Sequence, residues 1–177
     1  MTLDGFCDHT AIIPGDEIHQ HYADLLNTAD TILYGRITFQ LMEYWRTVVE
    51  NPTGNKATDE FALIMDNVPK IVFSHTLKNI EWESATLATR PLEETVLELK
   101  QSRKGGSKDI FVGSRSLIIQ LMNLNLIDEF QLCVHPVVSG SGLPLFNNIG
   151  NRIDLKLLKT KTFTGGAITL YYEPLKK

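Results

Sequence analysis

The sequence predicts an α/β fold with a mixed, mainly parallel sheet. Segments of helical periodicity alternate with short apolar runs of strand type through the middle of the chain, and helices between strands give parallel pairs. The last two strand-like segments flank the short Thr-Gly-Gly turn at 164–166, so we expect them to pair antiparallel. These observations predict a sheet that is parallel in its middle and antiparallel at its C-terminal end.

Composition predicts one globular domain over residues 1–177, long enough to bury a core. The net charge of -4 argues against a general nucleic-acid binder, which carries a basic face. No apolar run approaches the roughly 20 residues of a membrane helix, and we find no secretory signal. Cys7 and Cys133 lie far apart and in no metal-ligand spacing, so we expect no metal site and a cytoplasmic protein with reduced thiols, Cys133 being buried in a strand.

Apolar spacing and turn residues place the elements of the first half. Ile18, Tyr22 and Leu25 fall on one face of a helix, and Phe39 with Trp45 does the same in a shorter one. A Pro/Gly loop at 51–55 separates that helix from the next. We therefore expect helices over 16–26, 38–45 and 59–65, and strands over 31–34 and 70–74.

In the second half, Pro91 begins a helix, because a missing N–H costs nothing at the first helical position. Gly105 and Gly106 end that helix. Ser114 is a candidate N-cap for a helix that runs to about Leu124. The remaining expected elements are strands over 86–88, 109–112, 129–134, 152–162 and 167–173.

Two strand–glycine–helix junctions are candidate anion sites. The strand at 31–34 ends in Gly35-Arg36-Ile37-Thr38, where bare backbone N–H groups, a hydroxyl and a cation could meet a phosphate. The sequence 113–116, Gly-Ser-Arg-Ser, repeats the design. The alternative for each is a plain turn with a surface arginine. Neither is a G-x-G-x-x-G fingerprint or a P-loop, but two such junctions suggest a ligand with several phosphates, such as a dinucleotide.

A third segment is rich in glycine, serine and proline. It runs from the strand start at 126–130 into 135–146, and this composition requires an ordered, non-helical loop after the strand. A structural corner is the alternative to a functional loop.

Six segments in this order resemble the dihydrofolate-reductase-like family, and more narrowly the reductase (C-terminal) domain of the bacterial bifunctional riboflavin-biosynthesis deaminase-reductase and its free-standing relatives. The resemblance covers nearly the whole chain, and the order and spacing of the segments make it specific. The segments are 3–6 (LDGF), 30–39 (DTILYGRITF) with 44–45 (YW), 72–74 (VFS), 113–114 (GS), 126–129 (LIDE) and 136–146 (PVVSGSGLPLF).

The resemblance implies a three-layer dihydrofolate-reductase-like fold and NADPH as cofactor. Residues that would hold the cofactor phosphates are Gly35, Arg36 and Thr38. Residues near the adenosine ribose and its 2'-phosphate would be Ser74, His75, Thr76 and Lys78. Residues on the pyrophosphate and nicotinamide side would be Gly113, Ser114, Arg115 and Ser116. Residues bordering the nicotinamide and the substrate would be Leu3, Asp4 and Gly5.

The resemblance also implies an activity. We expect an NADPH-dependent reductase that transfers a hydride to a small heterocyclic substrate, in the manner of a 5-amino-6-(5-phosphoribosylamino)uracil reductase, acting at a CH-OH or CH-NH group. A homodimer is expected, with an apolar loop at 137–146. No His-x-Glu with a Pro-Cys-x-x-Cys partner is present, so we expect a free-standing reductase. The alternatives are a dihydrofolate reductase and a non-catalytic nucleotide-binding domain.

The chain departs from its family at two places near the substrate. Only Met1 and Thr2 precede Leu3, so most of the first strand is expected to be missing: the start is misassigned, the chain is shortened, or a partner fills the gap. Dihydrofolate reductases carry a carboxylate on the helix before the first junction, where spacing here favours His19. We consider His19 and Asp4 as candidate catalytic residues; for His19, a solvated helix histidine is the alternative.

Overall fold

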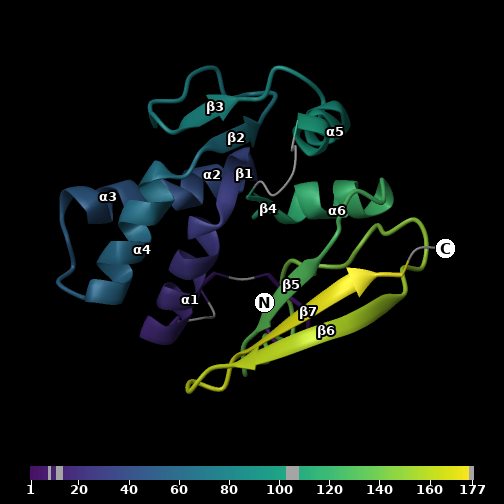
Figure 1. The fold of residues 1–177 in the computed structure, drawn as a ribbon. Helices are drawn as coiled ribbons and strands as arrows, with labels where there is room; N and C mark the ends of the chain where they lie inside the picture. Colours follow the sequence, from purple (N-terminus) through teal and green to yellow (C-terminus); the bar gives the residue numbers. More distant parts are fainter. Residues whose placement is uncertain (8, 11–13, 103–107, 176–177) are drawn as a thin grey trace. The chain divides into compact units, whose positions relative to one another are not determined.

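The structure is a computed structural model that describes residues 1–7, 9–10, 14–102 and 108–175. The chain forms two compact units (Figure 1). Residues 18–118 form the first, which we call the central unit, and residues 1–17 with 119–177 form the second, which we call the terminal unit. The expectation of one domain stays a prediction.

The central unit contains a four-stranded parallel sheet with the strand order β3-β2-β1-β4. In it, Gly35 pairs with Phe73, and Leu33 pairs with Val112. Because all the strands run the same way, their carboxyl ends lie at one edge of the sheet. The strands are β1 (Ala29–Gly35), β2 (Lys70–Phe73), β3 (Ala85–Leu87) and β4 (Asp109–Val112).

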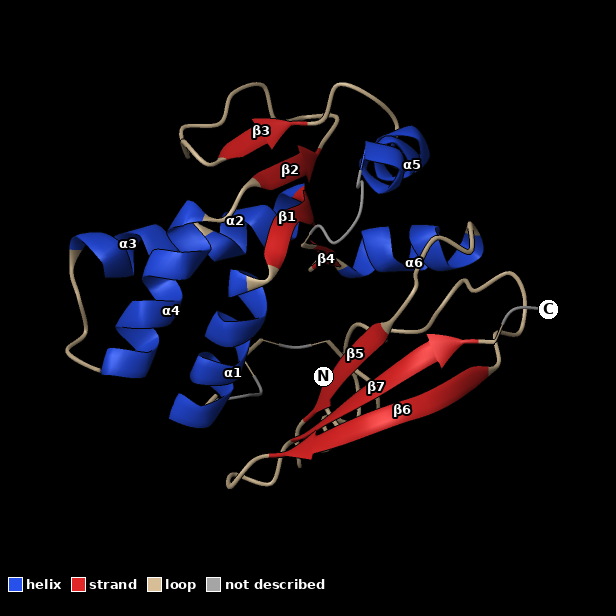
Figure 2. Cartoon of the chain, viewed as in Figure 1, coloured by secondary structure: helices blue, strands red, loops and turns tan. Residues whose placement is uncertain are grey.

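Helices flank this sheet, as Figure 2 shows. They are α1 (Asp16–Asn27), α2 (Arg36–Met42), α3 (Tyr44–Glu50), α4 (Lys56–Asn67), α5 (Leu92–Ser102) and α6 (Arg115–Asn123). The first residues of α1 and the last residues of α6 belong to the terminal unit.

The middle strand β1 is buried on both faces. Ile32 and Tyr34 belong to an apolar cluster with residues of α1, α2 and α4. Leu33 is also fully buried, and alternation along a strand directs it to the opposite face. Burial on both faces explains why residues 32–34 of β1 (Ile-Leu-Tyr) form a continuous apolar run in the sequence.

A buried lysine joins the end of α4 to the sheet. Lys70 is 1% exposed, and its Nζ donates to the carbonyl of Val68 at 2.7 Å and to Ser84 Oγ at 2.8 Å. The ammonium also lies 4.1 Å from the ring centroid of Trp82, whose Nε1 donates to the Asp66 carboxylate at 2.7 Å. Burial lowers the pKa of Lys70 to about 8. The cation is thus satisfied by hydrogen bonds to Val68 and Ser84 and by the Trp82 ring.

The terminal unit contains a three-stranded antiparallel sheet with the order β5-β7-β6. The strands are β5 (Phe130–Val134), β6 (Leu155–Thr162) and β7 (Ile168–Pro174). Main-chain bonds continue past β5: the Met1 nitrogen donates to the carbonyl of Cys133 at 2.7 Å, and the His135 N–H donates to the carbonyl of Met1 at 2.9 Å. Met1 therefore lies beside the end of β5.

The α/β fold and the antiparallel C-terminal hairpin are confirmed, with two differences in detail. The parallel and antiparallel parts form two sheets within the described residues. The helix expected over 38–45 is instead two helices, α2 and α3, which meet at Glu43. Cys133 is buried in β5 as expected, and the predicted stop at Gly105 and Gly106 lies outside the described residues. In the part of the chain that the structure describes, no helix is long and apolar enough to span a membrane.

Candidate functional site

The cofactor-binding residues predicted in the central unit gather at the carboxyl edge of its parallel sheet. Arg36 begins α2 directly after β1, Ser74 follows β2, and Gly113 follows β4. Since β2 and β4 both pair with β1, the structure brings these three chain segments together. Ligands of open α/β sheets bind at this edge.

A hydrogen bond joins the two glycine junctions directly. The Gly35 N–H donates to Ser114 Oγ at 2.7 Å, across 79 positions of sequence. Ser114 is 1% exposed, and its carbonyl accepts the Ile118 N–H at 2.9 Å, which places Ser114 at the N-cap position of α6 as predicted. One acceptor position of the Ser114 hydroxyl is thus used by the Gly35 N–H.

Gly113 is required by packing. A Cβ on this residue would lie 2.5 Å from Cε1 of Tyr34 and 3.3 Å from its Cδ1. Tyr34 is buried, and its hydroxyl lies 3.6 Å from the sulfur of Met65. Burial raises the pKa of Tyr34 far above its ordinary value. The absence of a side chain at Gly113 therefore leaves room for the Tyr34 ring, and this requirement holds whatever ligand the junction binds.

The remaining predicted groups at the two junctions are donors and cations. Arg36 is partly exposed, and its Nη1 donates to Gln40 Oε1 at 3.0 Å, one turn further along α2. Ser116 is exposed, and its Oγ lies 3.4 Å from the position that a Cβ on Gly35 would occupy. Thr38 and Arg115 are also partly exposed. An arginine is thus the first residue of each helix that follows a junction, Arg36 in α2 and Arg115 in α6.

Ser74 shapes the turn that follows β2. Its Oγ accepts the N–H of Thr76 at 3.2 Å and the N–H of Leu77 at 2.9 Å. His75, Thr76 and Lys78 are exposed on this turn. Together with the two junctions, the predicted cofactor-binding set contains arginines, a histidine and hydroxyls but no carboxylate.

In the terminal unit, the predicted substrate residues form a turn that is bound to the 136–146 loop. Asp4 accepts the N–H of Ser139 at 3.1 Å and the N–H of Gly140 at 2.7 Å. The hydroxyl of Thr2 and these amides lower the pKa of Asp4 to about 2. Leu3 is exposed, and Gly5 has a φ of +90°. Asp4 is therefore ionised at neutral pH and binds the loop; its catalytic role stays a prediction.

His19 lies among aromatic rings of the central unit. Its imidazole stacks on Phe61 with centroids 5.8 Å apart and meets Trp45 edge-on at 5.7 Å. Nδ1 lies 3.2 Å from Oγ1 of Thr58. These contacts give His19 a packing role between α1, α3 and α4, and its role as a proton donor stays a prediction. The neighbouring Glu17, in the terminal unit, accepts the N–H of Thr164 at 2.7 Å.

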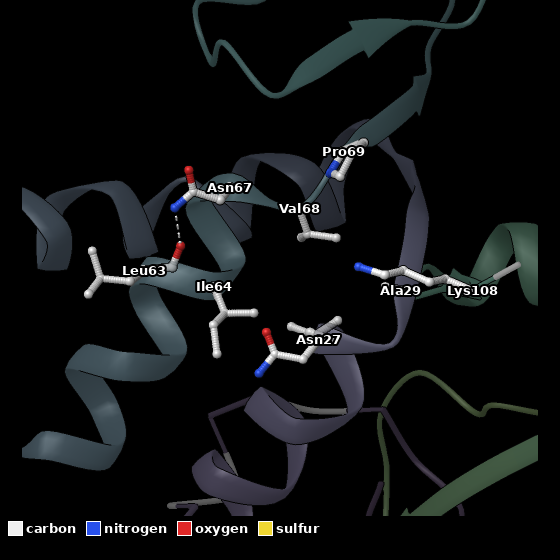
Figure 3. Close-up of a pocket in the computed structure, with 9 residues that line it drawn as sticks. Asn27, Ala29, Leu63, Ile64, Asn67, Val68, Pro69 and Lys108 are labelled. Carbon is white, nitrogen blue, oxygen red and sulfur yellow. Dashed lines mark hydrogen bonds between the residues drawn. The ribbon is translucent and has the colours of Figure 1, made fainter.

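A pocket of about 320 Å³ lies at the opposite, amino edge of the parallel sheet. Ala29 begins β1, Pro69 precedes β2 and Lys108 precedes β4, and all three line it (Figure 3). The Asn67 side chain at its rim donates to the carbonyl of Leu63 at 2.7 Å. Because the predicted cofactor residues lie at the carboxyl edge, this pocket is not part of that site.

Sequence reasoning missed the partners that hold the site. The sequence does not indicate that Tyr34 packs against Gly113 or that the Gly35 N–H bonds to Ser114. No local signal in the sequence marks these two contacts, because both depend on the register of β1 and β4.

The chain resembles known proteins over nearly its whole length. Residues 1–169 match the family described as the RibD C-terminal domain. The chain is 36% identical over 179 residues to the uncharacterized protein YyaP of Bacillus subtilis, covering 97% of this chain and 90% of YyaP.

Solved structures share the fold. A protein of Shewanella sp. PV-4, named for riboflavin biosynthesis, has a TM-score of 0.71 at 17% identity and covers 99% of this chain and 95% of its own. The Thermotoga maritima diaminohydroxyphosphoribosylaminopyrimidine deaminase/5-amino-6-(5-phosphoribosylamino)uracil reductase has a TM-score of 0.62 at 15% identity, covering 98% of this chain and 54% of its own. The chain therefore belongs to the RibD C-terminal domain family.

Proposed function

We propose that this protein is an NADPH-dependent reductase that transfers a hydride to a small heterocyclic substrate, with 5-amino-6-(5-phosphoribosylamino)uracil as the first compound to test. Family membership over residues 1–169 supports the reaction class. The named activity of the Thermotoga protein suggests the substrate. The thiols of Cys7 and Cys133 fit a location in the reducing cytoplasm.

The observation that carries the cofactor proposal is the donor set at the carboxyl edge of the parallel sheet. Three segments that are distant in sequence meet there and present guanidinium groups, hydroxyls and an imidazole without a carboxylate. Such a set fits a ligand with several phosphates. Arg36 and Thr38 would hold the pyrophosphate with 113–116, and Ser74, His75 and Thr76 would lie near the 2'-phosphate.

NADPH, when bound, supplies the hydride, and the protein orients the cofactor and the substrate and excludes water. The aligned ends of β1, β2 and β4 give this edge a rigid base, because each strand is hydrogen-bonded to its neighbour. The turn at Leu3, Asp4 and Gly5 is proposed to border the substrate. Its conformation is fixed by the two bonds from the 136–146 loop to Asp4.

The test measures cofactor binding and turnover separately. Titration calorimetry with NADPH and with NADH reports whether the 2'-phosphate contributes, and loss of reduced-nicotinamide absorbance reports turnover. Arg36→Met removes charge-assisted hydrogen bonds and is expected to weaken NADPH binding by about 10- to 100-fold. Arg90→Met is the matched control, because Arg90 is exposed on the same unit and pairs only with Glu98 among the described residues.

The outcomes separate the candidate functions. Turnover of the ribosylamino-pyrimidine supports the proposal, while methotrexate-sensitive turnover of dihydrofolate would assign the protein to dihydrofolate reduction. Binding of NADPH without turnover of either compound would favour a non-catalytic nucleotide-binding domain. Absence of NADPH binding would overturn the proposal altogether.

A homodimer is part of the proposal. Val138, Leu143 and Phe146 are exposed apolar residues of the 136–146 loop, and Val138 is 70% exposed. Sedimentation velocity is expected to give the mass of two chains. Val138→Asp should then shift the population toward single chains, whereas a single chain in the wild type would contradict the dimer.

A further inference from the structure

The two glycine junctions are joined by three contacts that involve only main chain, one hydroxyl and one ring. The Gly35 N–H donates to Ser114 Oγ at 2.7 Å, and the Gly113 N–H donates to the carbonyl of Leu33 at 3.2 Å. The Tyr34 ring lies directly against Gly113. These contacts make the end of β1 and the start of α6 a single structural piece.

The Ser114 hydroxyl replaces a bond of the parallel ladder. Leu33 pairs with Val112, where β4 ends, so the next bond of a continuing ladder would bring the Gly35 N–H to a main-chain carbonyl beyond β4. The N–H instead meets a side-chain oxygen. Ser114 can supply it because it is buried at the N-cap position of α6 and directs its hydroxyl back across the sheet edge.

Gly35 depends on this bond more than another residue would. It has no side chain that could pack or form hydrogen bonds, and no side-chain cap is present at the start of α2. Its φ of -83° and ψ of 159° are extended, and because glycine has no Cβ, sterics alone do not hold it in this conformation. The pairing of Gly35 with Phe73 of β2 and the bond from its N–H to Ser114 together fix the direction in which the chain leaves β1 toward Arg36.

We propose that Ser114 is a positioning residue: its hydroxyl holds the Gly35 backbone against the start of α6, so that the two glycine junctions form one cradle for the phosphates of the cofactor. This inference rests on the proposed function. It changes the expected role of Ser114 from direct contact with the cofactor to support of the residues that make that contact.

The first arm of the test needs no cofactor. Hydrogen exchange followed by NMR reports the Gly35 amide in the wild type and in Ser114→Ala, Ser114→Thr and Ser102→Ala. Ser114→Ala leaves a part-buried N–H without its acceptor, so its exchange should accelerate by at least about tenfold. Ser114→Thr keeps the oxygen and should remain close to the wild type. Ser102→Ala is the control for loss of a hydroxyl, because Ser102 is exposed on α5 and bonds the carbonyl of Leu99.

The second arm measures the dissociation constant for NADPH by calorimetry on the folded variants. Ser114→Ala is expected to raise it by at least about fivefold while Ser114→Thr restores it, and turnover at saturating cofactor should change less. A residue with a merely structural role would lower the melting temperature without changing the dissociation constant of the folded protein.

Each result has one meaning. Faster exchange at Gly35 with an unchanged dissociation constant in Ser114→Ala overturns the positioning role. Rapid exchange of the Gly35 amide in the wild type overturns it as well, and this measurement remains available if Ser114→Ala does not fold. A wild type that protects the Gly35 amide but does not bind NADPH refutes the proposed function and with it the cradle, while the hydrogen bond stands.

Discussion

Replacing Gly113 with alanine tests the packing at the second junction. The added Cβ would lie 2.5 Å from Cε1 of Tyr34, whereas carbon atoms in contact are normally about 3.5–4.0 Å apart. One side of this contact must therefore move by about 1 Å. Tyr34 is 3% exposed and belongs to the apolar cluster of the central unit, so its ring has little room to turn.

Overpacking of this kind costs about 1–3 kcal/mol of the free energy of unfolding. For a chain of this size, that corresponds to a melting temperature lower by about 2–12 °C. Urea denaturation followed by circular dichroism measures the free energy, and calorimetry measures the melting temperature. The matched control is Gly35→Ala, where the nearest atom to the new Cβ is Ser116 Oγ at 3.4 Å and φ is -83°. It should change stability by less than about 1 kcal/mol.

A double-mutant cycle attributes the cost to the ring. Tyr34→Val removes every ring atom that the new methyl group would meet. Its own cost will be large, but Gly113→Ala in that background should then be close to neutral. The reasoning is refuted if Gly113→Ala leaves the stability of the wild type unchanged, or if it costs the same with and without the Tyr34 ring.

Two further predictions concern charged groups. Lys70→Met leaves the carbonyl of Val68 without its 2.7 Å donor and should lower the free energy of unfolding by about 1–3 kcal/mol. Lys78 is exposed, so Lys78→Met should change that free energy by less than about 0.5 kcal/mol. Equal effects of the two substitutions in urea denaturation would refute the buried network. The Asp4 carboxyl should titrate by NMR with a pKa of about 2, below its ordinary value of 3.8. Because the folded protein favours the ionised carboxylate, the contribution of Asp4 to the stability of the fold is fully present above pH 3.8 and is lost as the pH falls through about 2. Asp4→Asn should remove this part of the acid dependence of stability. A measured pKa near 3.8 would contradict the bonds to Ser139 and Gly140.

The parts of the fold that follow from burial could be predicted from the sequence. The second half of β1 is apolar because both faces of the strand are covered there, and the hairpin of β6 and β7 is marked by the glycines of its turn. The division between α2 and α3 could not be predicted, because no proline or glycine marks Glu43, where the first helix ends and the next begins.

The members of the site could be predicted more readily than their roles. Gly35 and Gly113 are visible as junctions in the sequence, but the bond from Gly35 to Ser114 depends on the register of β1 and β4. That register is set by packing across the whole sheet and leaves no local mark. The glycine at 113 illustrates the same limit, since the sequence suggests close approach to a ligand and the structure adds close approach to Tyr34.

Both tryptophans of the chain, Trp45 and Trp82, lie in the central unit. Indole fluorescence therefore reports on that unit, whereas far-ultraviolet circular dichroism also detects the β5, β6 and β7 sheet. Trp82 also carries the Lys70 ammonium 4.1 Å from its ring centroid, so its emission should change as soon as the network around it opens. Whether the fluorescence and circular dichroism transitions coincide will show whether the two units unfold as one cooperative body.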